Sequence, residues 1–219
     1  ETFVVRGVVV LSQFEEGPII IADETGYMFI VKKLPVQLGD EIIVEGIVTL
    51  EMGIKLMWDY ETTMLVEIVS HGVANPLTPE IFTIPALNLL NMEDVSNWGR
   101  YVEVTGYVMY MEESFFPILQ AELGSGEIVP FVPVYVFQSG MFPDYEQLYQ
   151  YNGLRVVLKG FLLPNMDESD PFAPNKMILV PSEEQIILDY ETDQEKMDAL
   201  IMMGQYHLEG KIFRPGNDL

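Results

Sequence analysis

Cysteine is absent from this sequence of 219 residues, and cationic residues are scarce. Without cysteine, disulfide bonds, thiolate nucleophiles and cysteine-ligated zinc are excluded. Eleven Lys and Arg residues stand against 34 Asp and Glu residues, which gives a formal net charge of −23. Non-specific affinity for nucleic acid comes mainly from cationic contacts to phosphates, so this charge disfavours a broad electrostatic interface with DNA or RNA. Acidity of this size also serves simply to keep proteins in solution.

Long apolar runs and histidines are also missing or rare. No apolar run reaches the roughly 18 residues that span a bilayer, and the two histidines are His71 and His207. The sequence lacks Gly-x-Ser-x-Gly, a phosphate-binding loop, His-Glu-x-x-His and a dinucleotide glycine pattern. We therefore predict that the chain is not an enzyme. We expect His207 to lie on a strand and point to solvent; an enzyme would need one histidine to meet other polar groups in a pocket.

What the sequence has in plenty is a strand pattern with a central glycine. In residues 41–52, the side chains of Ile42, Val44, Gly46 and Val48 fall on one face, because side chains alternate along a strand. The same pattern recurs around Gly7, Gly106, Gly160 and Gly210. Glycine weakens a strand interior, so its repetition on an inward face predicts a geometric need, such as a sharp bend at a barrel corner.

Turn signals divide the first 70 residues into five predicted strands. These are 3–14, 19–22, 27–32, 41–52 and 54–58, the last resumed at 64–69. Asp23-Glu24-Thr25-Gly26 is predicted to form a tight turn in which Asp23 accepts backbone hydrogen bonds. Residues 71–85 contain Pro76, Pro79 and Pro85 and are predicted to be a linker. We therefore place a first domain at 1–70.

The second part of the chain repeats this order. We predict a helix at 86–95, strands at 100–111, 116–123 and 128–138, a helix at 144–151, and strands at 154–163 and 176–180, extended through 186–188. The second domain is therefore 86–190. In 191–219 we predict a helix at 192–203 that ends at Gly204, followed by a strand at 206–214. This tail either starts a third repeat, with neighbouring repeats beyond this chain, or is an addition to the second domain.

The first unit resembles an OB-fold of the kind found in bacterial surface proteins and secreted nucleases. Their motif runs Gly-x-Val, Asp-x-Thr-Gly and Gly-Asp-x-Val-x-Val-x-Gly-x-Val, and it matches 7–9, 23–26 and 39–48. In the second unit, the Asp-x-Thr-Gly turn is replaced by Leu123-Gly124-Ser125-Gly126. The Gly-Asp pair is replaced by Asn152-Gly153-Leu154.

This resemblance implies an all-β fold with short helices: two tandem five-stranded OB-like barrels plus a C-terminal helix–strand extension. It also implies a secreted or cell-surface protein.

OB-folds bind oligonucleotides or oligosaccharides across the face of strands two and three. The residues closest to such a ligand-binding face are Tyr27, Phe29, Lys33, Lys55 and Trp58. The two rings on the third strand fall on one face and could stack bases. Residues 1–70 nevertheless hold four basic and twelve acidic residues, net −8. The alternative is that these aromatic residues are ordinary core or exposed strand residues.

A metal site has one candidate, Asp167, Glu168 and Asp170 in the long connection before the last strand of the second unit. Dense carboxylate oxygens suit Ca²⁺, but EF-hand spacing and glycine are missing. A solvated loop explains the same residues. We therefore predict no cofactor, with Ca²⁺ at this loop as the alternative.

These observations leave two functions open. The first is a non-catalytic binding or scaffold module of a bacterial envelope or secreted protein, with a protein or glycan as its partner. Met- and Tyr-rich segments such as 109–111 suit an adaptable interface, unless they fill the second barrel. The alternative is a single-stranded nucleic-acid-binding OB-fold protein, or the accessory region of a secreted nuclease.

Overall fold

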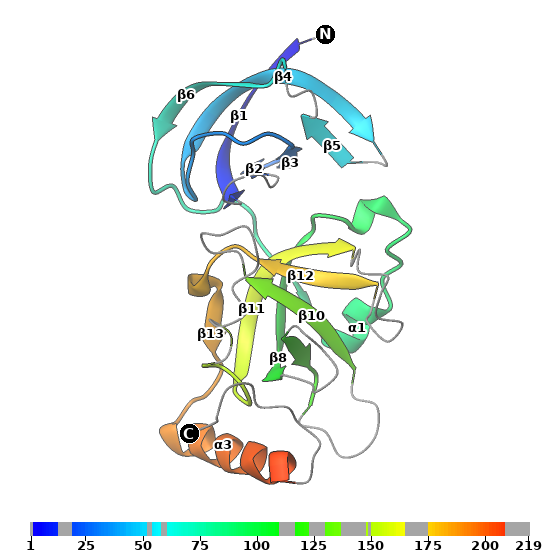
Figure 1. The fold of residues 1–219 in the computed structure, drawn as a ribbon, viewed down its shortest axis with the longest axis vertical. Coiled ribbons are helices and arrows are strands. Elements are labelled where there is room, and N and C mark those ends of the chain that lie inside the picture. Colours follow the sequence, from blue (N-terminus) through cyan, green and yellow to red (C-terminus); the bar gives the residue numbers. More distant parts are fainter. Residues whose placement is uncertain are drawn as a thin grey trace. The chain divides into compact units, whose positions relative to one another are not determined.

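Strand pairing divides the chain into two units, shown in a computed structural model (Figure 1). The structure describes residues 2–12, 19–51, 54–57, 61–109, 117–122, 130–136, 148, 150–164 and 175–208. Unit 1 includes Glu1–Thr78 together with Glu93–Gly99. Unit 2 includes Pro79–Met92, Arg100–Val136 and Pro143–Leu219.

Unit 1 is a closed five-stranded barrel with one further strand. Its strands are β1 (Thr2–Ser12), β2 (Ile19–Asp23), β3 (Gly26–Ile30), β4 (Glu41–Glu51), β5 (Ile54–Met57) and β6 (Met64–Ser70). The strand order is β1-β2-β3-β5-β4, and the ring closes because β4 also pairs with β1. The β3–β5 pair is parallel. β5 and β6 pair with successive parts of β4, so β6 resumes the fifth strand as predicted.

Alternation along the strands places the core of unit 1 inside this barrel. On β4, Ile42, Val44 and Gly46 are buried, whereas the residues between them are only half-buried. The inward apolar residues of the other strands form one cluster with Ile42 and Val44. From the β3–β4 connection, Leu34 belongs to this cluster and Val36 packs against it. The predicted inward face of residues 41–52 is therefore confirmed.

Unit 2 repeats the topology of unit 1. Its strands are β7 (Glu80–Phe82), β8 (Tyr101–Met109), β9 (Ile118–Gln120), β10 (Phe131–Val136), β11 (Arg155–Pro164), β12 (Lys176–Val180) and β13 (Ile186–Leu188). The strand order is β8-β9-β10-β12-β11, β11 pairs back to β8, and β10–β12 is parallel. β13 lies beside β11 as β6 lies beside β4. Two tandem OB-like barrels are thus confirmed by strand order alone.

The repeated glycines lie where a strand passes from one neighbour to the next. Gly7 on β1 pairs with β4, and the following residue also pairs with β2. Gly106 on β8 and Gly160 on β11 have equivalent positions in unit 2. A Cβ on Gly106 would lie 2.5 Å from the carbonyl oxygen of Gln120, and one on Gly160 would lie 2.6 Å from that of Leu179. The glycines therefore permit a close approach of backbones at the barrel corners, as predicted.

The predicted linker at 71–85 is wrong in its second half. Residues 80–82 form β7, which pairs in parallel with β8, and α1 (Ile84–Asn88) begins directly afterwards. Thr83 is the N-cap of α1 and accepts the N–H of Ala86 through its side chain. Proline in the first turn suits a helix start, because its missing N–H would have no intrahelical partner there. The helix therefore starts earlier than the predicted 86.

A buried lysine marks the end of α1. Lys176 on β12 is 2% exposed, and its Nζ donates to the carbonyls of Leu87, Asn88 and Leu90 at 3.3, 3.0 and 2.7 Å. Burial lowers the pKa of this amine. A long-range donor therefore satisfies the carbonyls at the helix end. Among the following residues, Val95–Asn97 form only a 3₁₀ turn (η1), so the predicted extension of the helix to 95 is wrong.

The C-terminal strand prediction is also wrong over its described part. α3 (Asp193–Leu208) continues through Gly204 to residue 208, so Tyr206 and His207 are helical. One glycine costs a helix only about 1 kcal/mol relative to alanine, and the surrounding Met, Ala, Leu and Gln residues favour a helix. Residues 209–214 and most of the predicted helix at 144–151 lie outside the described residues. Within the described part of the chain, no helix is long and apolar enough to cross a membrane.

Alanine at the corner glycines should destabilise the barrels by different amounts. Gly106→Ala and Gly160→Ala push a methyl group against a backbone carbonyl, so each should lower the free energy of unfolding by about 1–3 kcal/mol. In Gly7→Ala, the new Cβ would lie 3.1 Å from its nearest atom, the carbonyl oxygen of Ala22, so the loss of stability should be smaller. Denaturant unfolding of the three variants measures this order. Equal losses at Gly7 and Gly106 would contradict the role of backbone crowding.

Replacing Lys176 should weaken the attachment of α1 to unit 2. Lys176→Met keeps the apolar stem but removes the donor of three hydrogen bonds, so we expect a loss of about 1–3 kcal/mol in the free energy of unfolding. Hydrogen exchange should also become faster in Ile84–Leu90. Lys159→Met, at a partly exposed lysine on β11, is the control. Unchanged exchange around α1 would show that the lysine does not hold the helix end.

Candidate functional site

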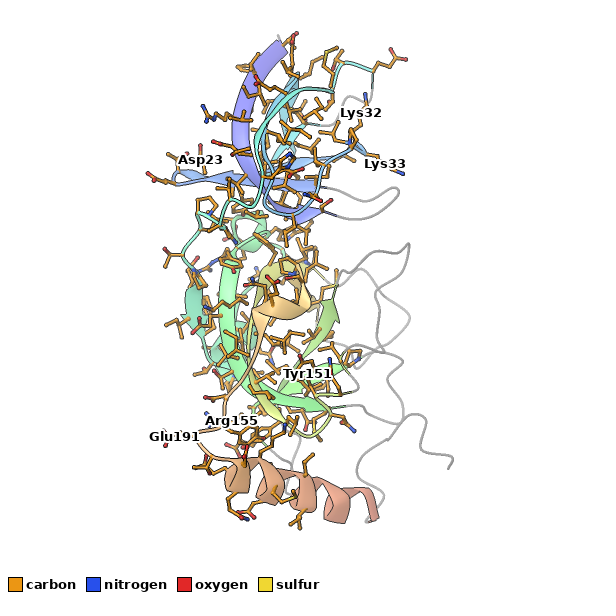
Figure 2. All side chains as sticks on the ribbon, turned by 90° about the vertical axis from the view of Figure 1, so that its left-hand side faces the viewer. Asp23, Lys32, Lys33, Tyr151, Arg155 and Glu191 are labelled. Atoms are coloured by element: carbon orange, nitrogen blue, oxygen red, sulfur yellow. The ribbon has the colours of Figure 1, made fainter. Side chains whose placement is uncertain are left out.

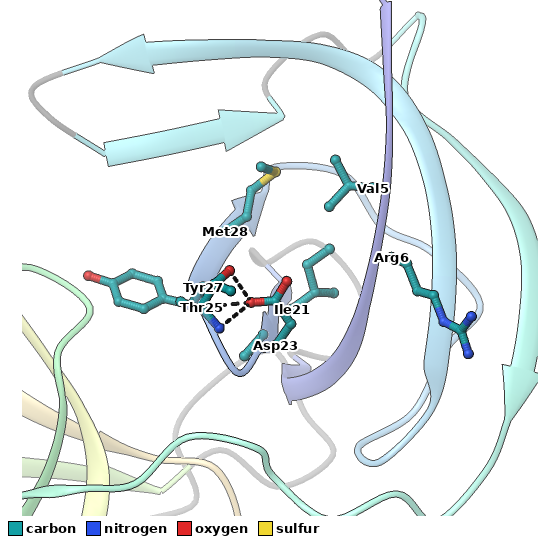
Figure 3. A pocket seen from close by; sticks show the side chains of 9 residues that line it. Val5, Arg6, Ile21, Asp23, Thr25, Tyr27 and Met28 are labelled. Carbon is teal, nitrogen blue, oxygen red and sulfur yellow. Dashed lines mark hydrogen bonds between the residues drawn. The ribbon is translucent and has the colours of Figure 1, made fainter.

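The β2–β3 hairpin of unit 1 carries the predicted ligand-binding face. Its turn is fixed by Asp23, whose Oδ1 accepts the N–H of Thr25, the hydroxyl of Thr25 and the N–H of Gly26 at 2.7, 2.6 and 3.1 Å. The predicted turn role of Asp23 is thus confirmed. Figure 3 shows Met28 directed into the barrel and Tyr27 directed away from it. Alternation along β3 therefore separates the core side from the outward side.

A small pocket opens beside this hairpin (Figure 3). It has a volume of about 80 Å³, with Val5, Ile21 and Met28 among its apolar lining and Asp23 and Thr25 among its polar lining. Ligand pockets for drug-sized molecules span roughly 300–1,000 Å³. This cavity is too small for such a ligand.

The two aromatic residues of β3 form a pair on the outward side. The rings of Tyr27 and Phe29 meet edge to face, with centroids 5.9 Å apart. Phe29 is only 6% exposed, and the Tyr27 hydroxyl donates to the main-chain carbonyl of Trp98. The structure therefore brings the two rings together but leaves little of Phe29 available for stacking.

The structure does not gather the other residues of the predicted face around these rings. Lys33 is exposed in the connection after β3, and Figure 2 shows it at the opposite end of the hairpin from Asp23. The backbone of Lys55 pairs with Leu50 on β4, and its side chain is outside the described set. Trp58 lies outside the described residues, as do the calcium candidates Asp167, Glu168 and Asp170. In the part of the chain that is described, no three His, Asp or Glu residues gather as a metal site.

One histidine does meet a carboxylate, which sequence reasoning missed. The Nδ1 of His71 lies 2.7 Å from Oδ1 of Asp40, and Asp40 is 1% exposed. The other oxygen of Asp40 accepts the N–H of Gln37 at 2.9 Å. The His71 side chain is itself largely exposed. This pair ties the segment after β6 to the β3–β4 connection, and neither of its residues lines the pocket beside the hairpin.

A larger cleft opens in unit 2 between the barrel and the segment that begins α3. Its volume is about 720 Å³, within the usual range for ligand sites. Figure 2 shows Arg155 and Glu191 near this junction. Five carboxylates line the cleft: Glu122, Asp189, Glu191, Glu195 and Asp198. Among the described lining residues, Arg155 is the cation, and the aromatic residues are Tyr107 and Tyr190.

Arg155, at the start of β11, connects the two sides of this cleft. Its guanidinium lies 3.3 Å from the carboxylate of Asp189, and its main-chain N–H donates to the hydroxyl oxygen of Tyr190 at 2.6 Å. Burial raises the pKa of Tyr190, with Tyr107 and Asp189 adding to the rise. Tyr190 therefore stays neutral and is held in place by the barrel.

The start of α3 is fixed by a reciprocal cap. The Glu195 carboxylate accepts the N–H of Glu191 and of Thr192 at 3.0 and 3.3 Å, while the Thr192 hydroxyl accepts the N–H of Glu195 at 3.3 Å. This is a capping box, whose Thr-x-x-Glu signature is legible in the sequence. The predicted helix at 192–203 begins at this cap, but no local signal relates the cap to Tyr107 or Arg155. The cleft itself was therefore missed.

Known structures offer a distant comparison with both barrels together. The p204 HINb domain gives a TM-score of 0.38 at 13% identity, over 80% of this chain and 91% of that chain. The Ifi202 HINa domain, in complex with 20-bp double-stranded DNA, gives a TM-score of 0.36 at 12% identity, over 86% of this chain and 98% of that chain. Fission yeast Pot1, in a structure with single-stranded DNA, gives a TM-score of 0.31 at 13% identity, over 95% of this chain and 89% of that chain.

No family model matches this sequence, and no curated protein matches it. At TM-scores this low, the likeness to these structures carries no argument about what the chain binds. The assignment of two OB-like barrels rests on their strand order and pairing.

Tyr190 should titrate at a pH above the ordinary value of 10.0. A group whose pKa is raised by folding contributes stability below its unfolded pKa and loses it as the pH rises through the folded pKa. Tyr190→Phe should therefore show a smaller loss of stability above pH 10 than the unsubstituted protein. Denaturant unfolding at several alkaline pH values measures this difference. Parallel stability curves for the two proteins would contradict it.

Proposed function

We propose that this chain is a non-catalytic binding module that holds a cationic segment of a partner protein in the cleft beside α3. The observation that carries the proposal is the composition of that cleft, in which five carboxylates and two tyrosines surround about 720 Å³. Carboxylates attract ammonium and guanidinium groups, and aromatic faces add cation–π attraction. A location in the bacterial envelope or outside the cell is also part of the proposal and is based on the resemblance to OB-folds of bacterial surface proteins.

The charges of the barrel surfaces support a cationic rather than an anionic ligand. Several of the eleven basic residues already pair with carboxylates on neighbouring strands or segments: Arg6–Glu41, Arg100–Glu80, Arg155–Asp189 and Lys159–Glu103. These pairs compensate four of the eleven cations, and the net charge of −23 opposes the binding of a phosphate backbone. The excess carboxylates, in contrast, steer a basic partner towards the protein.

The proposed role is non-catalytic, and the one described histidine–carboxylate pair lies apart from both pockets. The His71–Asp40 pair resembles part of a proton-transfer system, but neither residue lines the hairpin pocket or the unit 2 cleft. A general base must reach the proton that it abstracts, directly or through one water. We assign this pair a structural role in unit 1.

Single-stranded nucleic acid is the second candidate ligand. The observation that favours it is the closed OB strand order of unit 1, with the Tyr27–Phe29 ring pair on the face of strands two and three. Aromatic rings on that face stack bases without regard to sequence. The net charge opposes this candidate, and the burial of Phe29 limits it.

The first proposal predicts that a short oligoarginine peptide binds at low salt. Glu122→Gln with Glu191→Gln should weaken this binding about three- to tenfold, because two exposed carboxylates leave the cleft. Glu24→Gln with Glu67→Gln changes the net charge equally on exposed residues of unit 1 and should leave binding unchanged. Calorimetric titration of the three proteins measures these affinities.

Equal weakening in both double variants would mean that binding follows the overall charge, and the cleft proposal would fail. Absence of peptide binding would also reject it. A fluorescent oligothymidylate, titrated in parallel at low and physiological salt, tests the second candidate. Binding that weakens as salt rises would favour nucleic acid.

A further inference from the structure

The connection between α1 and β8 contacts the outward face of β3. This segment, Glu93–Gly99, belongs to unit 1, and we call it the strap. The strap folds on itself: the Asp94 carboxylate accepts the N–H of Ser96 at 3.0 Å, and the Asp94 carbonyl accepts the N–H of Asn97 at 3.0 Å. It is attached to the barrel where the Tyr27 hydroxyl donates to the Trp98 carbonyl. The strap is thus a short folded element rather than an extended link.

Gly99 is the point where the strap lies closest to the Tyr27 ring. Its φ is +71°, a conformation that favours glycine. A Cβ at this position would lie 2.5 Å from Cε2 and 2.8 Å from Cζ of Tyr27. A side chain at Gly99 would therefore both strain the backbone and push the strap away from the ring.

The strap lies on one end of the face that OB-folds use for ligands. Tyr27 pairs with Ala22 and Phe29 pairs with Ile20 across the β2–β3 hairpin. Phe29 is 6% exposed, and Ala22 and Ile20 are 2% and 0% exposed. Phe29 is therefore closed to solvent as a stacking surface, whereas Tyr27 is half-buried beside the strap.

We propose that the strap is an autoinhibitory cover that closes the Tyr27 end of the β2–β3 face of unit 1 to single-stranded nucleic acid, and that its displacement exposes the Tyr27 ring beside Phe29. The choice of ligand in this proposal rests on the second candidate function. The contact between the strap and Tyr27 is independent of that function. Stacking on the two rings would supply affinity once the face is open. The strap also carries Glu93 and Asp94, so its displacement takes two carboxylates away from a ligand rich in phosphates.

Two substitutions open the strap by different means. Gly99→Ala displaces it sterically, while Tyr27→Phe removes the bond to Trp98 and keeps the aromatic ring. The matched control is Gly72→Ala, because Gly72 has a similar φ of +69° and nothing within 4 Å of its Cβ position. Gly99→Ala combined with Phe29→Leu keeps the clash with the Tyr27 ring and removes the other stacking ring.

Hydrogen exchange of the strap amides measures opening, and fluorescence anisotropy with an oligothymidylate at low salt measures binding. We expect faster strap exchange and affinity raised about tenfold in Gly99→Ala, on the scale of stacking one base. Tyr27→Phe should change both in the same direction by less, and Gly72→Ala should match the unsubstituted protein. The gain in affinity should disappear in the double variant.

Unchanged strap exchange in both opening variants would overturn the proposal, because the Tyr27 contact would not hold the strap. An unsubstituted protein that binds as tightly as Gly99→Ala would overturn autoinhibition and leave the second candidate standing. An opened strap with no oligothymidylate binding in any variant would overturn both. None of these outcomes affects the peptide site proposed in unit 2.

Discussion

Backbone crowding beside the corner glycines is the constraint on which the barrel of unit 2 depends. At Gly106 and Gly160, the carbonyl of a neighbouring strand occupies the place of a Cβ. This close approach lets β8 pair with β9 as well as β11, and lets β11 pair with β12 as well as β8. Ring closure then buries the inward side chains. Without glycine at these corners, the strands could not turn so sharply between two partners.

The candidate sites lie on segments added outside the barrels rather than on the repeated strands. Both units share one strand order, yet the strap contacts β3 in unit 1, whereas the cleft of unit 2 lies between its barrel and the start of α3. The capping box at Thr192 and Glu195 fixes the helix start, and the Tyr190–Arg155 bond attaches the preceding residues to β11. The barrels thus supply a scaffold, and the additions make the two units chemically different.

The charge of the protein favours one of the two candidate ligands and opposes the other. A cationic segment gains from the carboxylates of the unit 2 cleft and from the net charge of −23. A nucleic acid must instead rely on aromatic stacking, because the same net charge repels its phosphates. The salt dependence of any binding therefore carries more information than its strength.

The sequence by itself determined the tandem barrels, the inward faces and the glycine corners, because these depend on period-two alternation and on turn residues close along the chain. It also placed Asp23 in its turn. Only the tertiary structure decided where α1 ends, since Lys176 reaches its carbonyls from β12. The same holds for the bond between Tyr27 and Trp98 and for the cleft around Arg155. Such contacts join residues far apart in sequence, and no local periodicity encodes them.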